Sequence, residues 1–457
     1  MTYTGILQRS ATIPRRFVIG VVASVDAAVL ALISSLGPIG GTLGAAALAT
    51  MLCCCFSPIG LVLLLTLISP IYSVPGIEDY TIHTVKWIAT IVVLAFTILQ
   101  LIIERNSADV RLGPMQRCFI LFVGWGATCS LFAVRPLDGL IELLRLSTFL
   151  LVYEIAATTI HRRRHITLIS ASVLIGVAAS SIYSMTTLWF DGFQRARGFF
   201  GNPNAFGQFL AFALPILFMG LLIHRRFVAR LMFGAGIVLG ISAVLFSWSR
   251  AAILCLAVQG VVYLIIEKKK KTILALVGLT VLVAAIVSVS PHTQTFVSTI
   301  LRLQAGTTHR TTLWETGLKA FQESPVVGLG LGIQKIDVVG KVMWNDFASF
   351  ELFSDMNTPY TPHNVYIYML MTTGFPGLIL FLLLYRSMIR DQWGSRRSAR
   401  STDERLLHSV MTCVLIGSLA HGFFETGSIF SYGSMANYFW ITLGMVEAIK
   451  RKNLLAD

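Results

Sequence analysis

The chain has 457 residues, of which 55% are hydrophobic and 13% are charged, and its mean hydropathy is +0.75. Soluble domains carry about 25% charged residues, so this composition excludes a soluble protein and indicates a polytopic membrane protein. The formal net charge is +14. Its basic residues form short clusters between apolar runs, a pattern of membrane topology rather than of a nucleic-acid-binding face. We therefore expect membrane lipids among the partners and no nucleic acid.

Apolar runs long enough to cross a bilayer recur along the chain. A helix needs about 20 apolar residues to span the hydrocarbon core. Residues 1–16 are basic but lack the apolar core and cleavage site of a signal peptide, so we expect the first run to be retained. The sequence predicts an all-α membrane protein with a single domain over residues 1–457 and about 14 spans, namely 17–36, 40–56, 57–73, 84–103, 115–134, 138–160, 166–190, 203–223, 228–247, 249–266, 272–291, 363–386, 406–425 and 430–449.

The distribution of charge predicts the sidedness of these spans. With both termini in the cytoplasm, the inner connections hold 25 of the 36 Lys and Arg residues, as the positive-inside rule requires. The outer connections are short except for residues 292–362, which we interpret as a long periplasmic loop with amphipathic helices. All seven cysteines fall in apolar runs, and neither a disulfide framework nor a zinc pattern is evident.

The first motif on the predicted outer side is Arg195-Ala-Arg-Gly-Phe-Phe-Gly-Asn-Pro-Asn204. We expect Asn202 to cap the helix that follows, with Pro203 in its first position. Free backbone N–H groups at a helix start attract anions, and Arg197 could add a bidentate phosphate donor. The alternative is a capped helix with an interfacial Arg whose stem snorkels.

The second motif, Ser247-Trp-Ser-Arg-Ala251, joins two expected spans with almost no turn. Arg250 must therefore lie at or just within the outer boundary of the membrane. A charge in that position is costly and by default indicates a functional site. An ion pair between helices or a contact with a lipid headgroup is the alternative.

The third motif lies in the long outer loop and reads Thr308-His-Arg-Thr-Thr-Leu-Trp-Glu-Thr-Gly-Leu-Lys-Ala-Phe321, followed by Ser-Pro-Val-Val-Gly-Leu-Gly-Leu-Gly. Arg310, Trp314 and Leu318 recur at i, i+4 spacing, which predicts an amphipathic helix that the proline and glycines end. We expect its apolar stripe to pack and Arg310, in its first turn, to be the functional residue.

The fourth motif, Thr361-Pro-His-Asn-Val-Tyr366, opens the span expected at 363–386. We expect Thr361 to cap this helix. The positive end of the helix favours an uncharged imidazole on His363, as a general base requires. A helix-end histidine bonded to a loop is the alternative interpretation. Other histidines expected on the outer side remain alternative candidates, namely His83, His292 and His309.

These four motifs, in this order and spacing, resemble the O-antigen ligase/polymerase family. That family is marked by a G-x-F-x-N-P-N stretch, a Ser-Arg pair, an Arg-x3-Trp helix with a following S-P-x-x-G-x-G, and a His-Asn ahead of a helix that contains Gly-x-x-Gly. Here the motifs read GFFGNPN, SWSR, RTTLW with SPVVGLGLG, and HNVYIYMLMTTGFPG. The resemblance covers residues 190–385, and the earlier spans are alike only in hydropathy.

The resemblance implies a GT-C-like integral membrane glycosyltransferase with an inverting, metal-independent mechanism and no cofactor. Its donor would be a glycan on undecaprenyl diphosphate at the periplasmic face of the bacterial inner membrane. The acceptor would be lipid A–core in a ligase, and another lipid-linked glycan in an O-antigen or exopolysaccharide polymerase. A polysaccharide or lipid transporter or flippase is a more distant alternative. Transporters place polar residues near the midplane of related halves, whereas the polar residues of this chain are concentrated at one face and in one loop.

By position, the resemblance assigns catalytic roles to His363, which would activate the acceptor hydroxyl, and to Arg310. Arg197, Arg310 and, less directly, Arg250 would bind the diphosphate, because cations can stabilise this leaving group without a metal ion. The supporting residues are expected to be Asn202, Asn204, Trp314 and Asn364. Acidic residues of the loop that remain alternative bases are Asp337, Asp346, Glu351 and Asp355.

Overall fold

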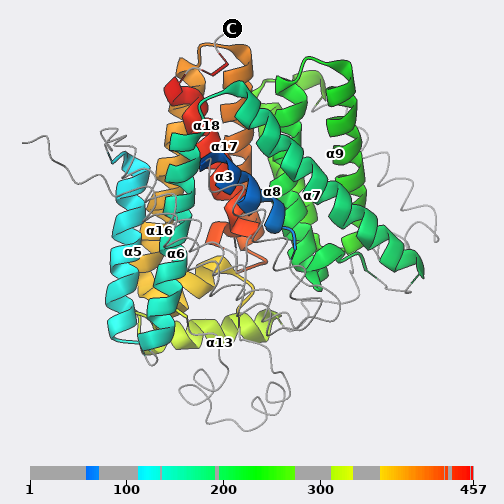
Figure 1. Ribbon diagram of the computed structural model, residues 1–457. Helices are drawn as coiled ribbons and strands as arrows, with labels where there is room; N and C mark the ends of the chain where they lie inside the picture. The colour runs from blue at the N-terminus through cyan, green and yellow to red at the C-terminus, as the bar shows by residue number, and fades with distance from the viewer. Residues whose placement is uncertain are drawn as a thin grey trace, which may run out of the picture.

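The protein is an all-helical bundle in the part of the chain that its computed structural model describes (Figure 1). The described residues are 58–71, 112–133, 136–190, 195–272, 310–332, 361–426, 428–430, 435–452 and 454–455. The helices are α3 (Pro58–Ile68), α5 (Pro114–Leu131), α6 (Pro136–Thr159), α7 (Arg163–Phe190), η1 (Gly198–Phe200), α8 (Pro203–Ile223), α9 (Phe227–Ser247), α10 (Arg250–Ile266), α13 (Arg310–Glu323), α16 (Val365–Ser398), α17 (Thr402–Gly422), η3 (Ser428–Phe430) and α18 (Met435–Lys452).

The helices confirm the predicted all-α class, and their bounds follow many of the predicted spans. Within the described residues, four helices are long and apolar enough to cross a membrane, namely Arg163–Trp189, Pro203–Ile223, Phe227–Ser247 and Val365–Ser398. The number of 14 spans stays a prediction, since four of the predicted runs lie wholly or almost wholly outside the described residues. Those runs are 17–36, 40–56, 84–103 and 272–291.

Two span boundaries differ from the prediction in ways that bear on function. Helix α16 has 34 residues and, at about 1.5 Å per residue, exceeds the roughly 30 Å hydrocarbon core. It therefore continues past the predicted end at residue 386 as a polar extension. Helix α17 ends at Gly422, so Glu425 lies in the connection that follows rather than inside the predicted span 406–425.

One end of the bundle collects the basic connections that the sequence places in the cytoplasm. Lys452 Nζ donates to the carbonyl of Ile160 at 2.8 Å, and Arg396 pairs with Glu267 at 3.0 Å. This end lies near the C-terminus in Figure 1, and α13 lies across the opposite end. The gathering of basic connections at one end of the bundle agrees with the predicted topology, while the orientation of the protein in a membrane stays a prediction.

An aromatic core anchors the chain segment that follows α17. The ring of Phe430 stacks on Phe122 at 5.5 Å and on Trp440 at 5.9 Å between centroids. Trp440 Nε1 donates to the carbonyl of Ile429 at 2.9 Å, and Arg145 donates to the carbonyl of Phe430 at 3.0 Å. Aromatic contacts and satisfied hydrogen bonds of this kind fix a backbone segment in place.

Helix α16 is broken at Gly374, where φ is 65° and ψ is −173°. Pro376, two residues further on, has no N–H to donate. A break of this kind leaves the carbonyls of the preceding turn without helical partners. Within a membrane, such groups must be satisfied by other parts of the protein.

The loop between α13 and residue 332 supplies most of those partners, and α5 supplies another. The loop is therefore docked into the break in α16 and holds α13 against it. The hydrogen bonds across this junction run from Leu329 N to Met371 O (2.8 Å), from Gly330 N to Thr372 O (3.0 Å), from Phe375 N to Pro325 O (2.9 Å) and from Trp125 Nε1 to Thr373 O (2.8 Å).

Glycine is required on both sides of this junction. Gly328 and Gly374 both have positive φ, at 66° and 65°. A Cβ on Gly328 would collide with the backbone of Thr372, and one on Gly374 with the carbonyl of Val326. The glycines after α13 were expected to end that helix. They also let two backbones meet, so SPVVGLGLG and TTGFPG form one structural unit.

Candidate active site

Three side chains from three separate segments meet at the α13 end of the bundle. Arg310, the first residue of α13, donates through one terminal nitrogen to the Phe424 carbonyl at 2.7 Å and through the other to Glu425 Oε1 at 3.1 Å. His363 Nδ1 lies 3.0 Å from the second carboxylate oxygen, Glu425 Oε2. One carboxylate therefore links the guanidinium and the imidazole that the motifs predicted as functional.

Glu425 is well placed to be an anion at neutral pH. Its side chain is only 13% exposed. Burial raises its pKa, but the hydrogen bond from His363 and the nearby positive charges, including Arg310, outweigh burial, and the pKa lies below its ordinary value. A carboxylate in this state accepts hydrogen bonds on both oxygens, as the geometry requires.

The backbone and ring of His363 are held in a specific orientation. Its φ is 45°, a left-handed conformation that costs a residue with a side chain about 1–3 kcal/mol. The side chain is 38% exposed. A carboxylate at Nδ1 favours a proton on that nitrogen, which leaves Nε2 on the side of the ring away from Glu425.

Asn364 caps α16 and ties its start to the segment after α17. Its Oδ1 accepts from the N–H groups of Tyr366 and Ile367 at 3.0 and 3.1 Å, and its Nδ2 donates to the Phe423 carbonyl at 3.3 Å. The prediction that Thr361 caps this helix was wrong, because α16 begins at Val365 and the cap position is therefore Asn364. The supporting role predicted for Asn364 in a functional site stays a prediction.

Arg195 joins the first two motifs. Its Nε donates to the Ser247 carbonyl at 2.9 Å, and its terminal nitrogen donates to Asn204 Oδ1 at 3.0 Å. Sequence reasoning did not single out this arginine. Arg197, which it did single out, is half-buried at the start of η1, and its predicted role with a diphosphate stays a prediction.

The predicted cap of α8 is confirmed. Asn202 Oδ1 accepts from the Asn204 N–H at 2.8 Å, and Pro203 is the first residue of the helix. Asn204 thus has two contacts, one with the cap and one with Arg195. Their predicted supporting role in a functional site stays a prediction.

The turn between α9 and α10 is as short as the second motif predicted. Trp248 adopts a left-handed conformation with φ of 51° and ends α9, and Arg250 is the first residue of α10. On α8, Gly207 packs so closely on this turn that a Cβ there would lie 2.7 Å from the Cβ of Ser249. The turn that leads into Arg250 therefore packs on the N-terminal part of α8.

With this geometry established, the chain can be compared with known proteins. Residues 235–382 match the family model of O-antigen ligase. The match confirms the resemblance to the O-antigen ligase/polymerase family. It includes Arg250, Arg310 and His363, whereas Arg197 and Glu425 lie beyond its bounds. The curated proteins contain no match to the chain.

The predicted site residues that the structure describes fall into two groups. Arg310, His363 and Asn364 meet around the segment after α17. The other group lies at the starts of two helices: Arg197 and Asn202 precede α8, Asn204 is its second residue, and Arg250 is the first residue of α10. Trp314 follows Arg310 by one turn of α13, and its buried indole N–H has no hydrogen-bond partner among the described residues.

Glu425 is the member of this cluster that the sequence analysis did not predict. It is the acidic residue at the end of an otherwise apolar run, and an ionisable residue in such a run is a signal of function. The alternative histidines and acids of the prediction, namely His83, His292, His309, Asp337, Asp346, Glu351 and Asp355, lie outside the described residues. No group of three or more His, Cys, Asp or Glu side chains that could hold a metal occurs among the described residues, and metal independence stays a prediction.

Proposed function

We propose that this membrane protein is an O-antigen ligase that transfers a glycan from undecaprenyl diphosphate to a sugar hydroxyl of lipid A–core. The family match supports ligase- or polymerase-type activity in general. The observation that carries the proposal further is the His363–Glu425–Arg310 arrangement, with a 3.0 Å contact between imidazole and carboxylate. In this proposal the site lies on the periplasmic face of the inner membrane and both termini lie in the cytoplasm.

The proposed reaction is an inverting displacement in one step. Nε2 of His363 takes the proton of the acceptor hydroxyl, and the oxygen attacks the anomeric carbon of the donor sugar. The bond from that carbon to the diphosphate oxygen breaks, and the lipid diphosphate leaves with the electron pair. Glu425 accepts the hydrogen bond from Nδ1–H throughout and stabilises the imidazolium that forms. Because the displacement inverts the anomeric carbon in one step, no carboxylate nucleophile is needed.

Arg310 has a more specific part in this proposal than a simple phosphate clamp. Two of its nitrogens already contact Phe424 and Glu425. It therefore holds the carboxylate that orients His363 and places a positive charge beside the leaving group. Arg197 and Arg250 would provide the remaining stabilisation of the diphosphate, as cations do in a site of low dielectric.

A polymerase would use the same donor and the same base, and would differ in its acceptor. The test is the product that accumulates in a strain without this protein. A missing ligase leaves lipid-linked polymer, whereas a missing polymerase leaves single lipid-linked repeats. Complementation by the wild-type chain, but not by His363→Ala, should restore the glycan ladder on lipid A–core. Accumulation of single repeats would overturn the ligase assignment.

A further inference from the structure

His421 is a buried histidine whose ring makes no hydrogen bond. It lies in the last turn of α17 and is 0% exposed. Neither of its ring nitrogens has a hydrogen-bond partner among the described residues. A buried polar group without a partner costs free energy, because it has lost its hydrogen bonds to water and gained none in the protein. Such a group in a native fold therefore requires an explanation.

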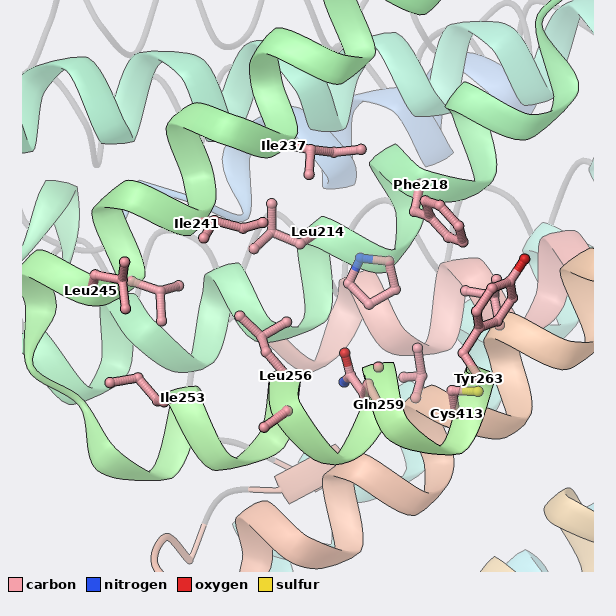
Figure 2. A pocket seen from close by; sticks show the side chains of 16 residues that line it. Leu214, Phe218, Ile237, Ile241, Leu245, Ile253, Leu256, Gln259, Tyr263 and Cys413 are labelled. Carbon is pink, nitrogen blue, oxygen red and sulfur yellow. The ribbon is translucent and has the colours of Figure 1, made fainter. Parts of the chain in front are cut away.

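Two other buried polar side chains, one on α10 and one on α17, show the usual arrangement. Gln259 of α10, which Figure 2 shows among the apolar side chains of a pocket, donates to the Ala211 carbonyl on α8 at 3.2 Å. His408 of α17 is also 0% exposed, and its Nδ1 lies 2.8 Å from Gln392 Oε1 on α16. His421 therefore differs from these residues in its lack of a partner and not in its burial.

The charged neighbours of His421 belong to the candidate active site. The N–H of Glu425 donates to the His421 carbonyl at 3.1 Å, which is the hydrogen bond of one further helical turn. Phe423, between them, has a helical φ of −68° and ψ of −21°. Side chains four residues apart in a helical turn lie on the same side, with their Cβ atoms about 5–6 Å apart. The imidazole of His421 therefore lies on the side of the Glu425 carboxylate, and it interacts electrostatically with Glu425 and Arg310.

The guanidinium of Arg310 already has acceptors within the protein. Its two terminal nitrogens donate to the Phe424 carbonyl and to Glu425 Oε1. A diphosphate that binds this guanidinium bidentately competes with both acceptors for its N–H groups. If Arg310 turns to the diphosphate, Glu425 Oε1 loses its donor, and a buried carboxylate oxygen requires another. An imidazole carries at least one N–H, and that of His421 has no acceptor among the described residues.

We propose that His421 is a positioning residue that replaces Arg310 as hydrogen-bond donor to Glu425 when Arg310 binds the diphosphate of the glycan donor. This exchange of partners rests on the proposed function, in which Arg310 binds that diphosphate. The exchange keeps the Glu425 carboxylate against His363 Nδ1 while the guanidinium moves. It also explains why the fold retains a buried imidazole that makes no hydrogen bond while Arg310 holds Glu425.

The first measurement is the unfolding midpoint of the full-length protein in detergent. His421→Phe removes both nitrogens and keeps an aromatic ring next to Phe212 of α8, whose centroid lies 6.4 Å from that of His421. Its midpoint should equal or exceed that of the wild type, because the ring makes no hydrogen bond among the described residues. His408→Phe is the matched control in the same helix, and its midpoint should fall because the contact with Gln392 is lost. An equal fall in both variants would show that the nitrogens of His421 serve the fold, which would overturn the proposal.

The second measurement is calorimetric titration of the same proteins with inorganic diphosphate. Binding that Arg310→Ala also shows is subtracted, so the remaining signal belongs to Arg310. We expect His421→Phe to bind diphosphate about tenfold more weakly than the wild type, because the exchange then leaves a carboxylate without a hydrogen bond. His421→Gln keeps an N–H donor, so its affinity should lie closer to that of the wild type than to that of His421→Phe.

The outcomes of this titration separate the exchange from the proposed function. Equal affinity of the wild type and His421→Phe would overturn the exchange alone, since Arg310 would still bind diphosphate. An affinity of His421→Gln as low as that of His421→Phe would also overturn it, because the N–H donor would then have no effect. Equal binding by the wild type and Arg310→Ala would contradict the diphosphate role of Arg310 in the proposed function, and with it the exchange.

Discussion

Among single residues, Glu425 links the parts of the site that the sequence presents as separate motifs. Its two oxygens contact different partners, Arg310 at 3.1 Å and His363 at 3.0 Å. A carboxylate that accepts from Nδ1 selects the tautomer of the imidazole and stabilises its protonated form. The chemistry attributed to His363 should therefore depend on a residue 62 positions away in the chain.

Glu425→Gln should lower the turnover number for glycan transfer by about 100-fold, because a neutral amide cannot stabilise the imidazolium of His363. The measurement is transfer by purified protein with saturating donor and acceptor. Glu315→Gln is a matched control, since Glu315 is an exposed carboxylate on α13. A turnover number for Glu425→Gln equal to that of the wild type would remove Glu425 from the mechanism.

Arg310→Lys should lower transfer by at least tenfold even though the charge is kept. A lysine has one nitrogen and cannot bridge the Phe424 carbonyl and the Glu425 carboxylate as the arginine fork does. Initial rates of transfer by the purified variant are the measurement, and the exposed Lys319→Ala on the same helix is the control. Full activity of Arg310→Lys would show that point charge alone is sufficient.

Among elements, the broken helix α16 connects the fold to the site. Its first half starts at the His363–Asn364 cap, and its break receives the loop that leaves α13. The loop and the break therefore set the position of Arg310 relative to His363. Because glycines at this junction have backbone rather than side-chain neighbours, the surroundings cannot move aside to accommodate a methyl group.

Gly374→Ala and Gly328→Ala should each destabilise the protein by about 1–3 kcal/mol or more, through a strained φ and a collision with backbone. The unfolding midpoint in detergent is the measurement. Gly394→Ala provides the control in the same helix, because a Cβ added to Gly394 would meet no atom within 4 Å. If the unfolding midpoint of Gly374→Ala equals that of Gly394→Ala, the junction is less tightly packed than described.

The sequence predicts local elements of this fold well and long-range pairs poorly. The helix over 203–223 was predicted at both ends, because an Asn-Pro start and a basic end enclose a continuous apolar run. The break at Gly374 was not predicted, since glycine and proline within an apolar run do not disturb its hydropathy. The partner of His363 was not predicted either, because Glu425 has no local signal that specifies a contact with residues 310 and 363.

On the scale of the whole molecule, the two ends of the bundle differ in chemistry. The end near the C-terminus holds ion pairs between neighbouring helices and connections, such as Arg225 with Asp403 at 3.0 Å and Lys450 with Asp391 at 3.0 Å. The opposite end holds the motif residues and α13. This polarity agrees with a basic cytoplasmic face and a reaction on the other side of the membrane.

Membrane-impermeant maleimide provides a test of that orientation. In a variant without native cysteines, Lys319→Cys on α13 should be labelled in cells whose outer membrane alone is permeable. Arg397→Cys, at the end of α16, should be labelled only after the inner membrane is opened. Both positions are exposed. The reverse order of labelling would place the candidate active site in the cytoplasm.

In the proposed reaction His363, oriented by Glu425, is the base for glycan transfer from a lipid diphosphate. The most direct measurement is transfer from a defined undecaprenyl diphosphate glycan to lipid A–core by purified wild-type protein and by His363→Ala. We expect product from the wild type, and none from His363→Ala at an unchanged unfolding midpoint. A wild-type rate of transfer from folded His363→Ala would contradict it.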